Sequence, residues 1–147
     1  MKQKGMTLAA AESCTGGMVS DMITTVPGSS EVFKGGVVCY TNQVKQGLLN
    51  VPQSVLDTAG AVSEETALRL AEQLLQLMDT DWAVSITGVA GPAESEGKPV
   101  GLVYVGVAQR GADTTVHKLQ LSGNREMIKL RASKNALYRL WSRVKQL

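Results

Sequence analysis

Residues 82–121, WAVSITGVAGPAESEGKPVGLVYVGVAQRGADTTVHKLQL, decide the architecture that the sequence predicts. Three apolar segments in this stretch are typical of strands, at 82–86, 100–108 and 114–121. The loop before the second segment carries no helical pattern, and only a tight turn, QRGAD, separates the second from the third. Connections without a helix join antiparallel strands, so the middle strand should run against both of its neighbours.

Two further strands are predicted upstream, at 6–11 and 35–40, and helical patterns separate them from each other and from residue 82. Strands joined through helices should be parallel, with right-handed crossovers. The sequence therefore predicts an α/β fold, a three-layer α/β/α sandwich around a five-stranded mixed sheet of order 2-1-3-4-5 with strand 4 antiparallel. The expected helical segments are 18–26, short pieces within 41–59, a helix that Ser63 caps and that runs to Met78, and a last helix that Asn124 caps.

Length and composition limit the class of protein. A chain of 147 residues with 44% hydrophobic residues fits one domain over 1–147. The net charge of +2 does not favour direct nucleic-acid binding, and no segment resembles a membrane span or a signal peptide. Two cysteines and one histidine predict neither a disulfide framework nor a metal site. We expect a soluble cytoplasmic protein.

Polar clusters follow four of the predicted strands. Their positions are 12–17 (ESCTGG), 40–45 (YTNQVK), 87–92 (TGVAGP) and 122–126 (SGNRE). In the predicted topology all four gather at one edge of the sheet, around the switch point between strands one and three, where open α/β sheets bind ligands. Two of the clusters, at Thr15-Gly16-Gly17 and at 122–124, open helices, and free N–H groups there favour an anion.

Each cluster alone also has a purely structural interpretation. Ser13 and Thr15 are common helix caps, and TGVAGP is an ordinary turn. Lys45 and Arg125 on helix faces are usually solvated, and Tyr40 at a strand end usually packs with a wet hydroxyl group. The convergence of four loops on one edge favours a ligand cleft over these separate explanations.

Six ordered blocks give the chain a family resemblance: AESCTGG, GSSEVFKGGVVCYTNQVK, GAVSEETA, SITGVAGP, KPVGLVYVGVA and SGNRE. Together they resemble the CinA C-terminal domain family, the nicotinamide-mononucleotide deamidases. The resemblance covers nearly the whole chain. It implies an enzyme of pyridine nucleotide salvage, which hydrolyses the carboxamide of nicotinamide mononucleotide to nicotinic acid mononucleotide and ammonia. Many family members form the C-terminal part of a longer two-domain protein and carry a helix before strand one.

Amide hydrolysis needs a nucleophile and a base. The single histidine lies on a predicted strand far from the cleft edge, so no Cys–His pair is available there, and the sequence has no metal-ligand cluster. A serine activated by a neutral lysine remains, and no cofactor is expected. The resemblance implies Ser30 as the nucleophile, Lys45 as its base and Tyr40 as an aid to proton transfer. It also implies that Ser13, Thr87 and Arg125 line the substrate site, and the guanidinium group of Arg125 suits the 5′-phosphate.

The predicted topology and the resemblance disagree about the nucleophile. Ser30 follows a helix that runs away from the carboxyl edge, so it should lie near the opposite edge, whereas Ser13 lies at the carboxyl edge. Either residues 28–36 return along the sheet or a second subunit supplies Ser30; otherwise Ser13 is the nucleophile. We expect a homodimer whose only other partner is the small-molecule substrate.

Two other functional classes fit the same residues. One is a non-catalytic nucleotide-binding or competence-related interaction module, although the presence of both Ser30 and Lys45 argues for activity. The other is an amidohydrolase that acts on a related pyridine compound.

Overall fold

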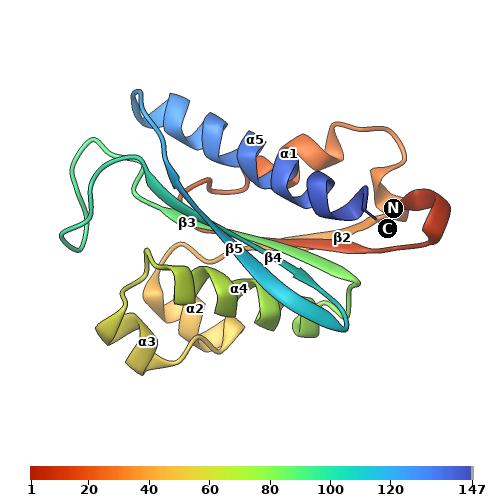
Figure 1. Cartoon of the computed structure of the whole chain (residues 1–147), viewed down its shortest axis with the longest axis horizontal. Coiled ribbons are helices and arrows are strands. Elements are labelled where there is room, and N and C mark those ends of the chain that lie inside the picture. Colours follow the sequence, from red (N-terminus) through yellow and green to blue (C-terminus); the bar gives the residue numbers. More distant parts are fainter. Residues whose placement is uncertain (147) are drawn as a thin grey trace.

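The computed structural model describes residues 1–146 and contains one five-stranded sheet between two layers of helices (Figure 1). The strands are β1 (Leu8–Glu12), β2 (Phe33–Val38), β3 (Trp82–Gly88), β4 (Leu102–Gln109) and β5 (Ala112–Gln120). The α-helices are α1 (Met18–Thr24), α2 (Asn42–Leu49), α3 (Gln53–Thr58), α4 (Glu64–Leu77) and α5 (Arg125–Val144). Two short 3₁₀ turns, η1 (Lys2–Lys4) and η2 (Ser29–Glu31), complete the elements.

The sheet has the predicted strand order, β2-β1-β3-β4-β5. Strand β1 pairs in parallel with both β2 and β3, while β4 is antiparallel to β3 and to β5. The predicted fold class is thus confirmed. The reversed strand has a consequence for the site: β5 runs parallel to β3, so its carboxyl end delivers the start of α5 to the same edge as the ends of β1 and β3.

Strand β1 begins two residues later than the apolar pattern predicts. The main-chain N–H and the hydroxyl group of Thr7 both donate to the Asp81 carboxylate, at 2.7 and 2.8 Å. These side-chain bonds connect the residue before β1 to the residue before β3, next to the main-chain bond that the N–H of Trp82 donates to the Thr7 carbonyl oxygen at 3.0 Å. The predicted caps of α4 and α5 are confirmed, because Ser63 accepts from the N–H of Thr66 and Asn124 from that of Met127.

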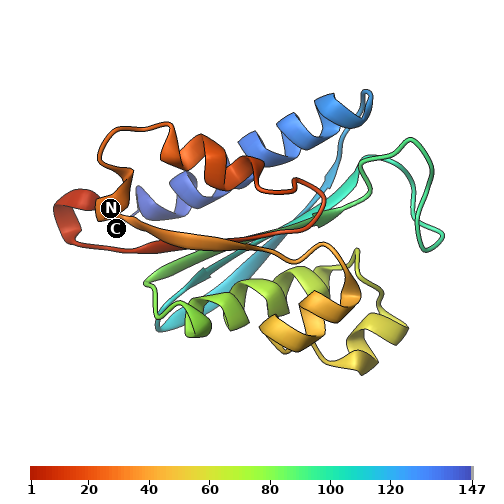
Figure 2. The same ribbon diagram turned by 180° about the vertical axis from the view of Figure 1, so that it is seen from behind.

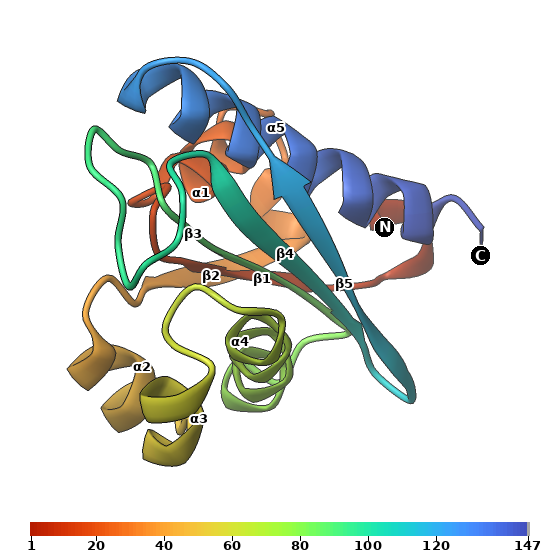
Figure 3. The same ribbon diagram turned by 60° about the vertical axis from the view of Figure 1, so that its left-hand side comes forward.

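Helices α1 and α5 cover one face of the sheet, and α2, α3 and α4 cover the other (Figures 1 and 3). Successive strand residues point to opposite faces, so one strand feeds two cores. On β1, Ala10 packs in the core beneath α1 and α5, whereas Ala9 and Ala11 belong to the core above α4. Among residues 1–146, no helix combines the length and apolar character needed to cross a membrane.

The buried carboxylate of Glu12 fixes how the chain leaves β1. It is fully buried and accepts from three main-chain N–H groups, those of Gly17, Val19 and Ser20, at 2.8–3.1 Å. The hydroxyl groups of Thr15 and Ser20 also donate to it. The N-cap residue of α1 is Gly17, which has no side chain to cap the helix. The Glu12 carboxylate from the preceding strand caps it instead.

A glycine in β2 makes room for this arrangement. A Cβ atom on Gly36 would lie 2.7 Å from Ser20 Oγ and 2.8 Å from the carbonyl oxygen of Ala10. The absence of a side chain at position 36 lets α1 approach the sheet closely enough for Ser20 to reach Glu12.

Candidate active site

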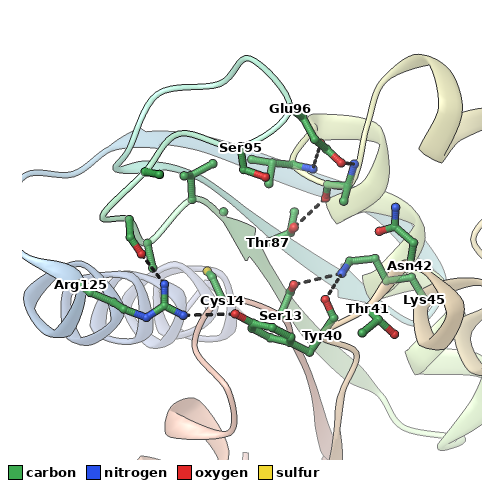
Figure 4. Close-up of a pocket in the computed structure, with 17 residues that line it drawn as sticks. Ser13, Cys14, Tyr40, Thr41, Asn42, Lys45, Thr87, Ser95, Glu96 and Arg125 are labelled. Atoms are coloured by element: carbon green, nitrogen blue, oxygen red, sulfur yellow. Dashed lines mark hydrogen bonds between the residues drawn. The ribbon is translucent and has the colours of Figure 1, made fainter.

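A cavity of about 320 Å³ opens at the edge of the sheet where β1, β2 and β3 end (Figure 4). Its wall combines the loops after β1, β2 and β3, the end of β3, the first turn of α2, the loop before α4, and the first residue of α5. The polar side chains on this wall are Ser13, Tyr40, Thr41, Asn42, Lys45, Thr87, Ser95, Glu96 and Arg125. The predicted convergence of four loops on one edge is what the structure shows.

Ser13 and Lys45 are in direct contact inside this cavity. Lys45 Nζ lies 3.1 Å from Ser13 Oγ, and only 1% of the lysine is exposed. Ser13 directly follows β1, and its N–H continues the strand ladder by donating to the Ile86 carbonyl oxygen at 2.9 Å. Its hydroxyl group is therefore presented by a residue whose backbone is held by the sheet.

Two carbonyl groups orient the Lys45 amine. Its Nζ lies 2.8 Å from the Cys39 oxygen and 3.2 Å from the Tyr40 oxygen. A neutral amine could donate its two N–H groups to these carbonyl groups and direct its lone pair at the hydroxyl group of Ser13. This is the arrangement that a nucleophile and its base require.

Burial favours the neutral form of this lysine. Desolvation lowers the pKa of Lys45 below its usual value of 10.5. Within residues 1–146 no carboxylate forms an ion pair with Lys45, so no ion pair offsets the cost of burying its charge. The amine is therefore better suited to accept a proton than a solvated lysine would be.

The two cysteines near Lys45 are poor nucleophiles. Burial raises the pKa of Cys14 to about 12 and that of Cys39 to about 11, so both thiols are protonated at neutral pH. Both side chains are buried and neither forms a disulfide bond. Ser13 therefore remains the better candidate nucleophile among the groups around Lys45.

Tyr40 and Arg125 contact each other at the other end of the cavity. Arg125 Nη2 donates to the Tyr40 hydroxyl group at 3.2 Å, and Nη1 donates to the carbonyl oxygen of Gly91. Figure 4 shows the Tyr40 ring extending below Ser13 toward the guanidinium group. The contact links the loops after β2 and β3 to the first residue of α5, and other N–H groups of Arg125 remain for a ligand.

Thr87 lies between these two ends. Its residue is 1% exposed, and its hydroxyl group donates to the Ala61 carbonyl oxygen at 2.7 Å. Because that proton is committed, the hydroxyl oxygen can face a ligand only as a hydrogen-bond acceptor.

Thr15, Gly16 and Gly17 do not line the cavity. The predicted anion site at this helix start is corrected by the structure, because the side chain of Thr15 and the N–H of Gly17 donate to Glu12. The negative charge that the start of α1 favours is that of the Glu12 carboxylate in the same chain.

Ser30 lies at the opposite edge of the sheet. It belongs to η2, immediately before β2, and the first residue of β2 pairs with Leu8 at the start of β1. The length of β2, roughly 17 Å, separates this position from the edge where Ser13 lies. The chain returns to the carboxyl edge only along β2, after Ser30, so one chain alone does not bring Ser30 to Lys45.

A connection across the cavity wall was not predicted. Glu96 accepts from the N–H groups of Ala61 and Val62 at 3.2 and 3.4 Å. Lys98 Nζ donates to the carbonyl oxygens of Ala59 and Val62 at 2.6 and 2.5 Å. These bonds fasten the loop between β3 and β4 to the loop before α4. The loop between β3 and β4 has no periodic pattern. The charged pair in SEGK (95–98) is the one sequence feature that could have indicated this connection.

Over the described residues 1–146, no group of three His, Cys, Asp or Glu side chains could hold a metal ion. The polar groups of the cavity are hydroxyl groups, an amine, a guanidinium group, an amide and one carboxylate. This set suits the binding of a polar organic molecule.

Comparison with known proteins identifies close relatives. A family model described as the CinA C-terminal domain matches residues 1–144. A competence-damage inducible protein of Geobacillus kaustophilus is 51% identical over 134 residues, covering 91% of this chain and 32% of that protein. One from Bacillus cereus is 49% identical over 147 residues, covering all of this chain and 36% of the relative. The chain thus spans about a third of the length of these relatives.

Solved structures share the fold. The competence/damage inducible protein CihA of Agrobacterium tumefaciens superposes with a TM-score of 0.93 at 38% identity, covering 96% of this chain and 87% of that one. A CinA superfamily protein of Klebsiella pneumoniae 700603 gives a TM-score of 0.95 at 28% identity, covering 99% and 91%.

Proposed function

Since this chain belongs to the CinA C-terminal domain family, we propose that its cavity hydrolyses the carboxamide of nicotinamide mononucleotide. The products would be nicotinic acid mononucleotide and ammonia, as expected of a cytoplasmic nicotinamide-nucleotide amidase in pyridine nucleotide salvage. The observation that carries the proposal is the 3.1 Å contact between Lys45 Nζ and Ser13 Oγ inside a cavity.

In the proposed first step, Ser13 Oγ attacks the carboxamide carbon while neutral Lys45 accepts the hydroxyl proton. The ammonium group then returns a proton to the departing nitrogen, which leaves as ammonia and yields an acyl ester on Ser13. In the second step Lys45 takes a proton from water and the hydroxide oxygen attacks the ester carbon. The bond between that carbon and Ser13 Oγ then breaks, Lys45 returns the proton to Ser13 Oγ, and the carboxylic acid is released. No external proton donor or oxidant is needed for this sequence.

Two side chains fit the rest of the substrate. The hydroxyl oxygen of Thr87, available only as an acceptor, suits an N–H of the carboxamide. Arg125 stands at the far end of the cavity from Lys45 (Figure 4), where its free N–H groups suit the 5′-phosphate. The Arg125 contact orients Tyr40, whose phenol is therefore proposed to position substrate.

The proposal assigns the nucleophile to Ser13. Within one chain Lys45 contacts Ser13, whereas Ser30 lies at the other sheet edge. The role for Ser30 that the family resemblance implies stays a prediction, and it requires a second copy of the chain.

The direct test is ammonia release from nicotinamide mononucleotide by purified protein, with and without a chelator. We expect turnover that the chelator does not abolish and that Ser13→Ala removes. Binding of the mononucleotide without ammonia release would support an interaction module, a class that the competence-related names of the relatives suggest. Faster release from another pyridine carboxamide in a substrate panel would support the alternative amidohydrolase.

A further inference from the structure

Glu96 is the one acidic side chain among the described residues that line the cavity, and the proposed reaction gives it no role. The basic side chains on the same wall are Lys45 and Arg125. A carboxylate repels the phosphate of the proposed substrate, so its charge is unfavourable in this cavity unless it faces a positive group of the substrate. The chemistry of the ligand must therefore account for Glu96.

The loop before α4 holds the Glu96 carboxylate in place. Figure 2 shows the loop between β3 and β4 extending past the sheet edge and bending toward the layer that contains α3. The hydrogen bonds from the N–H groups of Ala61 and Val62, at 3.2 and 3.4 Å, are near the long limit for such bonds. The ion pair with Lys98 is 3.8 Å long and partly exposed. These contacts fix the carboxylate and leave its negative charge to act on the cavity.

The main chain of Glu96 adopts a conformation that glutamate disfavours. Ser95 and Lys98 exchange two main-chain hydrogen bonds, at 2.8 and 3.2 Å, which close a tight turn. The two central residues, Glu96 and Gly97, have φ angles of +52° and +68°. A turn with two left-handed residues favours Asn-Gly, because most other side chains are strained there. The side chain of Glu96, rather than its backbone, therefore explains its position at the tip of this turn.

Glu96 is connected to the end of the cavity where the carboxamide is proposed to bind. Its partner Ala61 also accepts, through the carbonyl oxygen, from the Thr87 hydroxyl group at 2.7 Å. Burial is the largest influence on the pKa of Lys45 and lowers it, and the negative charge of Glu96 acts on it in the opposite direction. Figure 4 shows Glu96 beyond Thr87 and well apart from Arg125. The carboxylate is thus near the proposed reacting groups, and the guanidinium group is at the other end.

The charges of nicotinamide mononucleotide follow the same order. Its pyridine nitrogen carries the glycosidic bond to ribose, so the ring is a cation directly next to the carboxamide. The phosphate lies at the opposite end of the molecule. With the carboxamide at Ser13 and the phosphate at Arg125, the positive ring lies in the same half of the cavity as Glu96.

We propose that Glu96 is a specificity-determining residue, whose carboxylate selects mononucleotides with a positively charged pyridine ring over those with a neutral ring. The inference rests on the proposed function, because it requires a ring between the carboxamide and the phosphate. It narrows the substrate class to N-substituted pyridinium carboxamides. Dihydropyridine mononucleotides have a similar outline without the charge, and they are the competitors against which such a carboxylate discriminates.

Calorimetric titration of two mononucleotides tests this role. One is nicotinamide mononucleotide, and the other is benzamide riboside 5′-phosphate, in which a carbon atom replaces the ring nitrogen and removes the charge. Ser13→Ala chains, which cannot perform the proposed reaction, serve as the background. We expect Glu96→Gln to raise the Kd of the cationic mononucleotide at least about fivefold, as for a partly exposed charge pair, and that of the neutral one by less than about twofold. Equal changes in both constants would overturn the inference.

Lys98→Met is the matched control. Lys98 fastens the same loop to the carbonyl oxygens of Ala59 and Val62, but it does not line the cavity. We expect Lys98→Met to keep the preference for the cationic ring, because the charge of Glu96 remains. Glu96→Asp, which keeps the charge on a shorter side chain, should recover part of the preference that Glu96→Gln loses. Far-ultraviolet circular dichroism confirms folding of each variant. Equal loss of the preference in Lys98→Met and Glu96→Gln would assign the effect to loop position and overturn the inference.

Ammonia release by the wild type separates this inference from the proposed function. If the cationic mononucleotide binds without ammonia release and Glu96→Gln still lowers the preference, the proposed reaction fails and ring selection stands. If ammonia is released and Glu96→Gln leaves the preference unchanged, ring selection fails and the reaction stands. Absence of binding of either mononucleotide would overturn both.

Discussion

Lys45 Nζ lies 3.1 Å from Ser13 Oγ and donates to no carboxylate in the described chain; its other contacts are the carbonyl oxygens of Cys39 and Tyr40. The pair is formed by residues 32 positions apart. It brings the end of β1 and helix α2 together in one reactive unit.

The first prediction concerns this unit. Ser13→Ala and Lys45→Ala should each lower kcat by on the order of 10²–10⁴-fold, and the double variant should be little worse than either, because the two groups act together. Steady-state ammonia release gives the values. Multiplicative losses in the double variant would show that the two residues act independently.

The second prediction concerns Ser30. If it belongs only to the far sheet edge of its own chain, Ser30→Ala should keep turnover within about threefold of the wild type, since surface changes rarely perturb a distant site. Mixing inactive Lys45→Ala chains with Ser30→Ala chains distinguishes the alternative. If Ser30 acts on a second copy, Ser30→Ala alone is inactive and the mixture regains activity in hybrid dimers, which would return the nucleophile to Ser30.

The third prediction is a pH dependence. Lys45 must be neutral to accept a proton, and burial lowers its pKa, so kcat/KM should rise with pH and level off below 10.5. The unfolded chain binds more protons at this residue between the folded pKa and 10.5, so the contribution of Lys45 to stability rises with pH in that window.

Lys45→Met removes the titrating group while keeping an unbranched side chain. Relative to the wild type it should be most stable at low pH, with the difference shrinking as pH rises through the window. Urea unfolding at several pH values measures this. A difference that does not vary with pH would show that Lys45 binds its proton equally in the folded and unfolded chains, which would contradict a lowered pKa in the folded protein.

The fourth prediction concerns Arg125. A charge-assisted bond contributes about 1.5–3 kcal/mol, so Arg125→Ala should reduce kcat/KM for the mononucleotide by about 10- to 150-fold. The dephosphorylated nucleoside should lose little, and Arg125→Lys should recover part of the loss because it restores charge without the planar fork. Equal losses for both substrates would mean that Arg125 acts through Tyr40 or Gly91 rather than through phosphate.

The fifth prediction concerns Glu12. Glu12→Gln keeps the shape but presents an N–H₂ group to donors, so the free energy of unfolding should fall by at least about 2 kcal/mol. Glu31→Gln is the control, because Glu31 forms an exposed ion pair with Lys2 and should cost about 1 kcal/mol or less. Chemical denaturation of both variants gives the comparison, and similar small losses would refute the capping role.

The fold could be predicted because it depends on patterns along the chain. Loop lengths between 82 and 121 fix the reversed strand, and the caps at Ser63 and Asn124 are local. The partner of Lys45 could not be predicted in this way, because it depends on the rotation of α2 against the sheet.

Glu12 shows the same limit more sharply. Its place in a polar cluster at a strand end indicates a ligand site, but its donors come from the turn that follows and from α1. Such a cluster either binds a ligand or forms hydrogen bonds among its own groups, and the outcome depends on which side of the strand the carboxylate faces. The connection made by Glu96 and Lys98 was missed for a related reason, since their partners at 59–62 are main-chain groups, which carry no sequence signal.

The hydrogen bond between Tyr40 and Arg125 crosses the rim of the sheet. Tyr40 leads into the helical layer of α2, and Arg125 begins the helix of the opposite layer. A molecule that reaches from Lys45 to Arg125 would span the same rim and act as a mechanical brace between the two layers. Occupancy of the cavity would then restrict the motion of the two helical layers relative to each other, at a distance from the atoms that react.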